Sequence, residues 1–163
     1  MTKPNEQLSN LIMEYKPQLF RMATGILKNS IDAEDALSET ICKAFSNFQN
    51  LRDLKKFKPW IMKILVNEAY AIANKRKKFI SLEEDIPIDN NDSAIIDSIV
   101  LWDIVQSLDD EFRDVILLFY YEDMSIKEIS KILQIPVGTV FSRLNRSRQK
   151  LKNIMLKEGV SKI

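Results

Sequence analysis

The sequence contains no histidine and only one cysteine, Cys42. Zinc sites and nucleophile pairs of the Ser–His or Cys–His kind need these residue types, so both kinds of site are excluded. A single cysteine allows no internal disulfide, which fits a reducing compartment. The sequence also lacks a phosphate-binding glycine loop and a cluster of carboxylates. We therefore expect no metal, no cofactor and no enzymatic activity.

Helix-breaking residues and long apolar runs are scarce as well. Only three glycines and five prolines occur among 163 residues, which favours helix throughout the chain. No apolar stretch approaches the roughly 18 residues that a membrane-spanning helix needs. The first residues, Met1 to Glu6, lack the basic and then apolar plan of a signal peptide. These absences predict a helical, cytoplasmic protein that is not itself a membrane protein.

Charge is plentiful, but it is divided into blocks. Residues 52–79 hold nine Lys and Arg against two acids, and residues 124–157 hold eight against one. Between these blocks, residues 80–97 carry six acids and no base. One basic run often marks only a solvated helix face. Two basic blocks of equal net charge, separated by an acidic segment, indicate two surfaces that bind a polyanion.

Apolar residues recur at helical spacing through the first half of the chain. The spacing predicts a helix over residues 8–15 and a second helix that starts at Pro17, because proline is tolerated at a first helical position. A third helix follows, for which Asp32 is the predicted cap. Residues 49–54 break the helical period, so we expect a loop there.

A long helix is predicted from Phe57 to the basic cluster 75–78. Trp60 lies on its apolar stripe, so we assign Trp60 to the core rather than to a surface that stacks bases. Residues 81–92 are acidic and show no period, which indicates a linker. The prediction is an all-α chain of two small helical domains, 5–79 and 98–158, joined by a flexible acidic linker over 80–97.

The second domain contains the sharpest signal in the sequence. Its first part includes a helix that Asp109 can cap. Further along, Ser125 and Glu128 form a capping box that opens a short helix. Pro136 turns the chain, since the residue before a proline resists the helical conformation, and another helix starts at Val137. This pattern predicts a helix-turn-helix with a polar and basic face for DNA, the alternative being a helical hairpin with a solvated basic face.

Four motifs, in this order along the chain, resemble those of the extracytoplasmic-function (ECF) sigma factors of the bacterial sigma-70 family. Residues 32–40, DAEDALSET, resemble the helix that binds core polymerase, and residues 57–67 resemble the helix that contacts the −10 element. Residues 108–115 resemble the pattern L-P-x-x-x-R-x-V, with Asp109 in place of proline. Residues 125–144, SIKEISKILQIPVGTVFSRL, resemble the region 4 pattern S-x-x-E-I-A-x-x-L-x-I/V-P-x-G-T-V-x-S-R-L.

The resemblance implies a sigma factor that directs RNA polymerase to the promoters of a stress or envelope-signal regulon and so starts transcription. It implies three sets of contacts. The core-polymerase-binding set is Asp32, Glu34, Asp35, Glu39 and Thr40. The −10 DNA-binding set is Asn50, Arg52, Lys56, Lys63, Asn67, Lys75 and Arg76. The −35 DNA-binding set is Thr139, Ser142, Arg143, Arg146 and Lys150.

The resemblance also implies partners: the core enzyme of RNA polymerase, promoter DNA and an anti-sigma factor, which can be membrane-anchored. The protein is expected to be a monomer when free of partners. Phe141 departs from the polar or basic residue common at its position, so contact with a thymine methyl, packing within the domain and contact with a partner all stay open. Asp32 and Glu34 could instead only stabilise a helix N-terminus, an explanation that suits Glu39 less well.

An operator-binding helix-turn-helix regulator is the alternative function. Such a protein needs a dimerisation surface or a ligand pocket, and its first domain would not bind polymerase. Co-purification with core polymerase separates the two functions. A helical-repeat adaptor is excluded, because no period of about 34 residues recurs.

Overall fold

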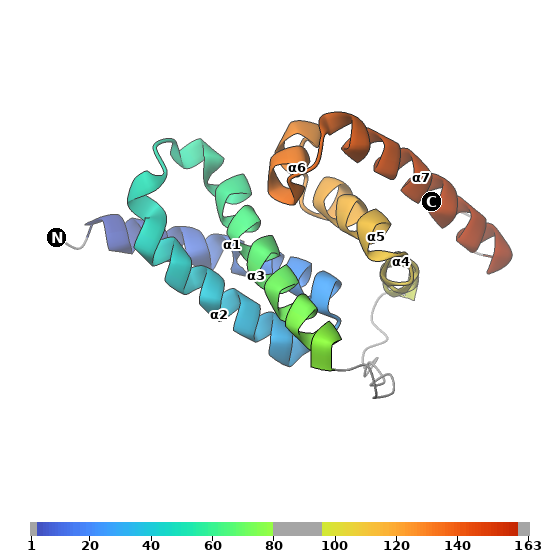
Figure 1. Ribbon diagram of the computed structural model, residues 1–163, viewed down its shortest axis with the longest axis horizontal. Helices are drawn as coiled ribbons and strands as arrows, with labels where there is room; N and C mark the ends of the chain where they lie inside the picture. The colour runs from blue at the N-terminus through green and yellow to red at the C-terminus, as the bar shows by residue number, and fades with distance from the viewer. Residues whose placement is uncertain (1–2, 80–95, 160–163) are drawn as a thin grey trace. The chain divides into compact units, whose positions relative to one another are not determined.

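The computed structural model describes residues 3–79 and 96–159. Within these ranges the chain forms helices and no strands, which confirms the predicted all-α class. The chain divides into two units, residues 1–88 and 89–163 (Figure 1). Residues 80–95 of the predicted linker lie outside the described residues, and its last two residues begin a helix. No helix in the described ranges is long and apolar enough to cross a membrane.

Three long helices form the first unit: α1 (Lys3–Leu27), α2 (Ser30–Asn47) and α3 (Phe57–Phe79). Two short 3-10 turns, η1 (Phe48–Asn50) and η2 (Leu54–Lys56), connect α2 to α3 where a loop was predicted. Each long helix packs on the other two (Figure 1). Their shared core consists of apolar residues at helical spacing: Leu8, Ile12, Leu19, Met22, Ala23, Ala33, Ala36, Leu37, Ala44, Phe57, Ile61, Leu65 and Ala69.

Pro17 lies inside α1, so the predicted helix break before it is wrong. Proline removes the hydrogen bond to the carbonyl four residues earlier, which belongs to Met13. Both residues are exposed, so water can bond to the freed carbonyl. Burial of Ile12 and Leu19 on the inner side of α1 keeps the helix continuous across the proline.

The cap of α2 is Asn29, and the prediction that Asp32 fills this role is wrong. Oδ1 of Asn29 accepts hydrogen bonds from the backbone N–H of Ile31 at 2.8 Å and of Asp32 at 3.0 Å. Lys28, with φ of 56°, gives α1 the left-handed ending that makes the tight connection possible. Asp32 then lies in the first turn of α2, where its carboxylate is available for another partner.

An aromatic cluster fixes the start of α3. The ring of Phe57 lies 5.7 Å from that of Tyr15, 6.4 Å from that of Phe48 and 5.8 Å from that of Trp60, measured between centroids. Each such pair contributes about 0.5–1.5 kcal/mol beyond the area it buries. Trp60 is half-buried in this cluster, in keeping with its assignment to the core. The cluster also anchors the η1–η2 segment that precedes α3.

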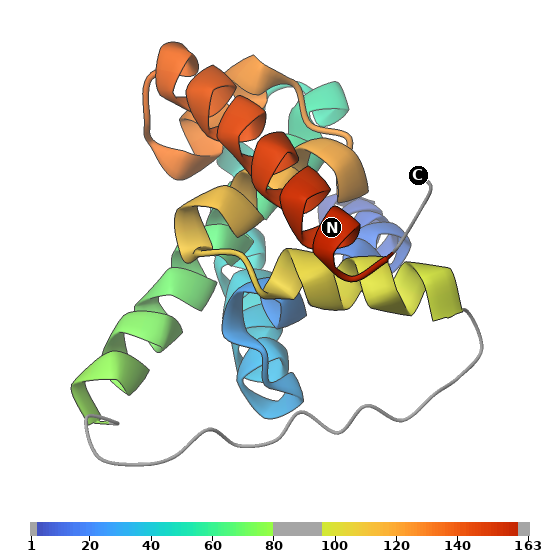
Figure 2. The ribbon, with the colours of Figure 1, turned by 90° about the vertical axis from the view of Figure 1, so that its right-hand side faces the viewer.

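The second unit contains α4 (Ile96–Gln106), α5 (Asp110–Ile116), a π-helical turn η3 (Leu117–Tyr121), α6 (Ile126–Leu133) and α7 (Val137–Lys157). Helix α7 packs on α4, α5 and α6, with α4 crossing near its C-terminal half (Figure 2). The core of this unit is apolar: Ile104, Val105, Leu108, Phe112, Val115, Ile116, Leu117, Leu118, Met124, Ile129, Ile132, Val140 and Leu144.

The predicted helix-turn-helix is confirmed. Oγ of Ser125 accepts from the N–H of Glu128 at 3.1 Å, and Oε1 of Glu128 accepts from the N–H of Ser125 at 3.2 Å, so the capping box is present. Helix α6 ends at Gln134, whose φ of 57° is left-handed, and Pro136 precedes α7. Asp109 stands at the N-cap position of α5, but its side chain makes no capping hydrogen bond.

A charged pair is buried in the second unit. Nε of Arg113 donates to Oδ1 of Asp114 at 3.0 Å, and the two side chains are 2% and 3% exposed. Nη1 of Arg113 also lies 3.0 Å from Oδ1 of Asp110, which is 62% exposed. A buried charge that loses its partner is costly, so the arginine of the 108–115 motif has a structural role.

Arg113→Met should lower the free energy of unfolding of the second unit by about 3–5 kcal/mol, because the buried carboxylate of Asp114 then loses its charge-assisted hydrogen bond from Nε of Arg113. Urea unfolding followed by Trp102 fluorescence measures this, in a Trp60→Phe background that removes the other tryptophan. The control is Asp110→Ala, which removes the exposed partner of Arg113 and should cost about 1 kcal/mol or less. Equal losses in the two variants would contradict the assignment.

Candidate functional site

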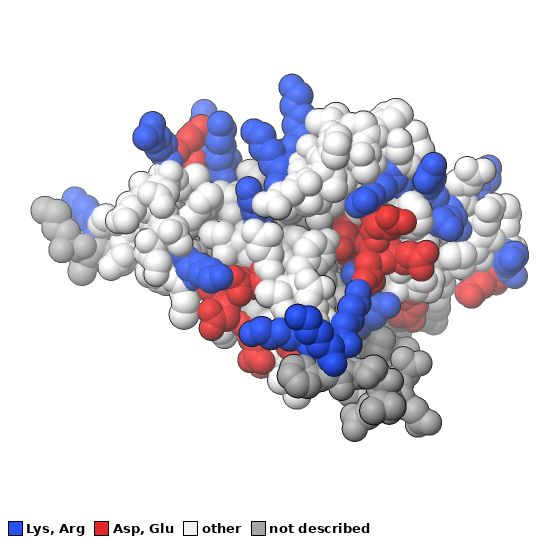
Figure 3. Space-filling view, in the orientation of Figure 1, with Lys and Arg blue, Asp and Glu red and all other residues white. Residues whose placement is uncertain are grey.

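The acidic residues of α2 divide into one that bonds within the unit and three that face solvent. Oδ2 of Asp32 lies 2.7 Å from Nη1 of Arg76 on α3, and both side chains are half-buried. The other three, Glu34, Asp35 and Glu39, are exposed. Figure 3 shows acidic side chains gathered over α2 in this unit. The exposed acids therefore offer a negative surface to a basic partner, whereas Asp32 ties α2 to α3.

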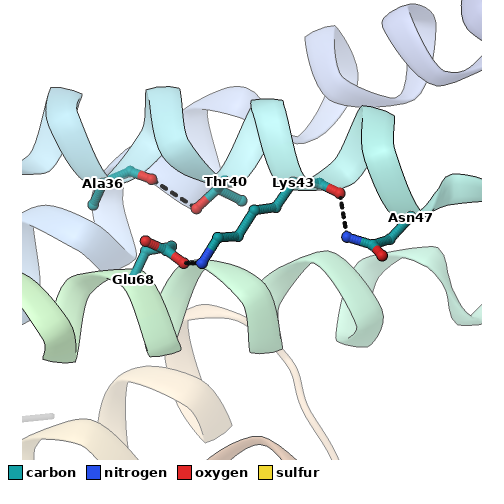
Figure 4. A network of polar contacts seen from close by, with 5 residues as sticks. All are labelled: Ala36, Thr40, Lys43, Asn47 and Glu68. Carbon is teal, nitrogen blue, oxygen red and sulfur yellow. Dashed lines mark hydrogen bonds and ion pairs between the residues drawn. The ribbon is translucent and has the colours of Figure 1, made fainter.

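Thr40 does not belong to this surface, although the sequence motif placed it there. Its side chain is completely buried, and its hydroxyl donates to the carbonyl of Ala36 at 2.7 Å (Figure 4). A buried threonine whose hydroxyl is bonded within its own helix packs α2 against its neighbours. Direct contact between Thr40 and a partner protein is thus excluded in this conformation.

A second ion pair joins α2 to α3 beside Thr40. Nζ of Lys43 bonds to Oε1 of Glu68, and Nδ2 of Asn47 donates to the backbone carbonyl of Lys43 at 2.8 Å (Figure 4). The hydrogen bond to Glu68, the charge of Glu68 and, more weakly, that of Glu39 raise the pKa of Lys43. A raised pKa in the folded state means that this contribution to stability is fully present below the unfolded pKa, and it is lost only as pH rises through the folded pKa.

Five of the seven residues predicted for the −10 element fall into two groups. Lys63 is half-buried and Asn67 is exposed, and their spacing of four places them on the same side of α3. At the η1–η2 segment, Asn50, Arg52 and Lys56 are all exposed. There the Oδ1 of Asp53 accepts from the N–H of Lys55 at 3.0 Å and shapes the connection.

The basic cluster at the end of α3 is only partly available to a ligand. Lys75 is exposed, whereas Arg76 is half-buried and paired with Asp32. Figure 3 shows basic side chains at this end of α3 and, in the same unit, around η1 and η2. Of the two predicted residues, Lys75 can reach a phosphate without breaking an ion pair.

The side of α7 that meets solvent is set by its contact with α5. Val140, Leu144 and Ser147 are buried along one side, and the hydroxyl of Ser147 lies 3.1 Å from the carbonyl oxygen of Phe112. Ser142 and Arg146 lie on the opposite side and are exposed. A helix-turn-helix with this exposed side can enter a DNA major groove.

The predicted −35 residues do not form one surface. Ser142 and Arg146 share the outer side of α7, with Thr139 half-buried nearby. Arg143 is half-buried, and its Nη2 lies 3.7 Å from Oε2 of Glu111 on α5. The ammonium of Lys150 lies 5.1 Å from the ring centroid of Phe112, also on α5. Arg143 and Lys150 therefore flank the outer side rather than belonging to it.

Sequence reasoning missed Asn145, which is exposed on α7 between Ser142 and Arg146. The signal that could have found it is its spacing of three from Ser142, which places both on one helix face. Phe141, the residue that departs from the motif, is 55% exposed and can contact a ligand.

Fold and surfaces define a two-unit helical protein with a helix-turn-helix in its second unit. The family model described as sigma-70 region 2 matches residues 11–79, and the model described as sigma-70 region 4 matches residues 98–151. The chain is 31% identical over 157 residues to the RNA polymerase sigma factor SigV of Bacillus subtilis, covering 94% of each chain. It is 27% identical to the ECF sigma factor SigW of the same organism, covering 90% of this chain and 88% of that one. The chain thus belongs to the sigma-70 family of RNA polymerase sigma factors, as a member of the ECF group.

Two solved structures share the fold. The sigma factor RpoE of Bartonella quintana, solved with the anti-sigma factor NepR, has a TM-score of 0.75 at 22% identity and covers 92% of this chain and 97% of its own. CnrH, solved with the cytosolic domain of CnrY, has a TM-score of 0.67 at 19% identity and covers 93% and 88%. Family membership favours the sigma-factor function over the operator-binding alternative.

Glu111→Gln should tighten binding of the full chain to duplex DNA about twofold to fivefold, because it releases Arg143 from its ion pair. Fluorescence anisotropy with a labelled duplex at several salt concentrations measures this affinity. The plot of log affinity against log salt concentration should become steeper by the slope expected for one additional phosphate contact. Asp109→Asn changes the net charge equally, and Asp109 forms no ion pair among the described residues. Equal gains in both variants would show that Glu111 does not restrain Arg143.

Proposed function

We propose that this chain gives RNA polymerase its promoter preference, with residues 5–79 and 98–158 as its two working domains and 80–97 as the acidic linker. The observation that carries the proposal is the exposed polar side of α7 in a helix-turn-helix, within a chain that matches sigma-70 regions 2 and 4 in order. The experiment is to add the protein to core polymerase and sequence the transcripts that appear. Absence of new start sites would contradict the proposal.

The second domain, in this proposal, recognises the −35 element. Ser142 and Arg146 project from the outer side of α7 into the major groove, where arginine bonds bidentately to guanine and serine suits several bases. Arg143 and Lys150, on the flank next to α5, contact the phosphates on one side of the groove. Thr139 lies in the first turn of α7, where its contact is with the DNA backbone.

The first domain, in this proposal, binds the −10 element as an opened strand. Single strands are bound by positive grooves together with stacked or pocketed bases. Asn67 and Lys63 on α3, together with Arg52 in the connection before it, supply polar and positive contacts along one path. Asn50 and Lys56 flank that path, and Lys75 adds a phosphate contact at its far end.

Core polymerase is the proposed partner of the acidic side of α2. The exposed carboxylates of Glu34, Asp35 and Glu39 complement a basic helical surface on the polymerase. Asp32 contributes indirectly, because its ion pair with Arg76 fixes the orientation of α2 on α3.

An anti-sigma factor, which can be membrane-anchored, is the proposed inhibitor. The support is the structural likeness to RpoE, a protein solved with the anti-sigma factor NepR. The chain then acts in the cytoplasm as a monomer when free of partners, and as a non-enzymatic subunit once bound to polymerase.

Glu39→Lys should weaken binding to core polymerase on the order of tenfold or more, because a like charge then faces a basic surface. Titration of core enzyme against labelled protein measures the affinity, and circular dichroism checks the fold. Glu14→Lys makes the same change on the exposed side of α1 and serves as the control. An unchanged affinity for Glu39→Lys would contradict docking through α2.

Arg146→Ala should cost about 1–3 kcal/mol of promoter affinity, because a bidentate contact to a base is lost. The affinity of holoenzyme for a promoter recovered by transcript sequencing measures the loss. Lys157→Ala, at the far end of α7, is the control and should weaken binding only slightly. A loss of a few tenths of a kcal/mol for Arg146→Ala would refute its role.

A further inference from the structure

The guanidinium group of Arg148 on α7 is held by the π-helical turn η3. Its Cζ lies 5.6 Å from the ring centroids of both Phe119 and Tyr120, and its Nε donates to the Tyr120 hydroxyl at 2.6 Å. The two rings meet edge to face at 4.9 Å between centroids. A cation beside two aromatic rings is stabilised by their quadrupoles. Arg148 is therefore fixed in place although its side chain is exposed.

The fixed guanidinium determines how the amide of Asn145 points. Nη1 of Arg148 lies 3.1 Å from Oδ1 of Asn145. Guanidinium donates and cannot accept hydrogen bonds, so the amide atom facing it must be the oxygen. Nδ2 then faces away from Arg148 with both of its N–H groups available. The chemistry of the neighbour thus selects one of the two orientations of the amide.

Asn145 occupies a place on α7 where such an orientation matters. It is exposed next to Arg146 and three residues after Ser142, about 100° around the helix from the buried Leu144. The N-terminal half of a recognition helix contacts base edges in the major groove. An amide with its donor fixed outward is consequently prepared for a base before DNA binds.

We propose that Asn145 is a specificity-determining residue for the upstream promoter element and that Arg148 is its positioning residue. The proposal rests on the proposed function and concerns the same DNA surface. Arg148, Tyr120 and Phe119 do not contact the base; they orient the amide that does. Arg148 is in this way distinct from Arg146, whose guanidinium contacts DNA directly.

The chemistry of the amide specifies a purine, with adenine preferred. Nδ2 donates to N7, which both purines carry, while the second lone pair of Oδ1 accepts from the N6 amino group of adenine alone. The hydrogen bond from a cation polarises the amide and strengthens donation from Nδ2. A pyrimidine offers the amide only one partner at this edge, the O4 acceptor of thymine or the N4 donor of cytosine, so it is disfavoured against adenine, which offers both.

The test is a selection with holoenzyme made from the full chain and core polymerase. The template library is duplex DNA with a randomised upstream hexamer, and recovered sequences are counted. Wild-type protein should enrich a purine, adenine foremost, at the position read by Asn145. Asn145→Ala should reduce the preference at that position about 5- to 150-fold and leave the other positions unchanged.

Two conservative variants distinguish the role of Arg148 in orienting Asn145 from a general effect of its positive charge. Arg148→Lys keeps the positive charge but replaces the two separate nitrogens that bond to Tyr120 and Asn145 with a single ammonium, and it should relax the preference at the same position about 2- to 12-fold. Tyr120→Phe keeps the ring and removes only the hydroxyl, and it should give a smaller loss at that position. Circular dichroism confirms that the variants fold.

The outcomes are distinguishable. If Asn145→Ala retains the wild-type base preference, the proposal is overturned while the sigma-factor function stands. If Arg148→Lys weakens all sequences equally, Arg148 is a phosphate contact and its positioning role is refuted. If wild-type holoenzyme enriches no upstream sequence, the proposed function itself fails and this proposal falls with it.

Discussion

The contact of Ser147 with α5 is the constraint on which the DNA surface depends. A small side chain at this point lets the two helices approach closely, and its hydroxyl lies within hydrogen-bonding distance of the carbonyl of Phe112. Rotation of α7 by one residue, about 100°, would place polar side chains in the core and expose Leu144. The orientation of α7 about its own axis is therefore specified by burial, and the outward residues follow from it.

The first unit depends in a similar way on polar contacts between α2 and α3. Asp32 with Arg76 and Lys43 with Glu68 join the two helices, while Thr40 fills the buried side between these pairs. The acidic residues of this one motif therefore have different roles. Asp32 fixes the position of α2 on α3, whereas the exposed acids give α2 a negatively charged surface.

Sequence patterns predicted the features that depend on neighbours along the chain. The capping box at Ser125, the turn before Pro136 and the periodicity of α7 are all local, and each is present in the structure. The continuous α1 across Pro17 was not predictable in this way, because burial elsewhere in the helix outweighs the missing hydrogen bond. The cap of α2 is Asn29 and not the predicted Asp32, because α2 begins three residues earlier than predicted, directly after the left-handed end of α1.

The sequence allowed prediction of which residues belong to the candidate DNA surface of α7, but not of how their side chains are arranged on it. The sequence placed Arg143, Arg146 and Lys150 together because all three are basic and lie on one helix. Their separation depends on Glu111 and Phe112, which are far away in the sequence and come close only through packing of α5 on α7. Long-range contacts of this kind leave no periodic trace, and the same holds for Tyr120 beside Arg148.

The π-helical turn at residues 117–121 has a consequence for how the chain tolerates changes in length. A π turn corresponds to an α-helix that has gained one residue, and such turns occur often at functional sites. Deleting one residue there would restore regular α-helix and turn the preceding or following side chains by about 100°. Tyr120 would then leave Arg148, although every residue type of that contact could be kept. In this segment the number of residues matters as much as their identity.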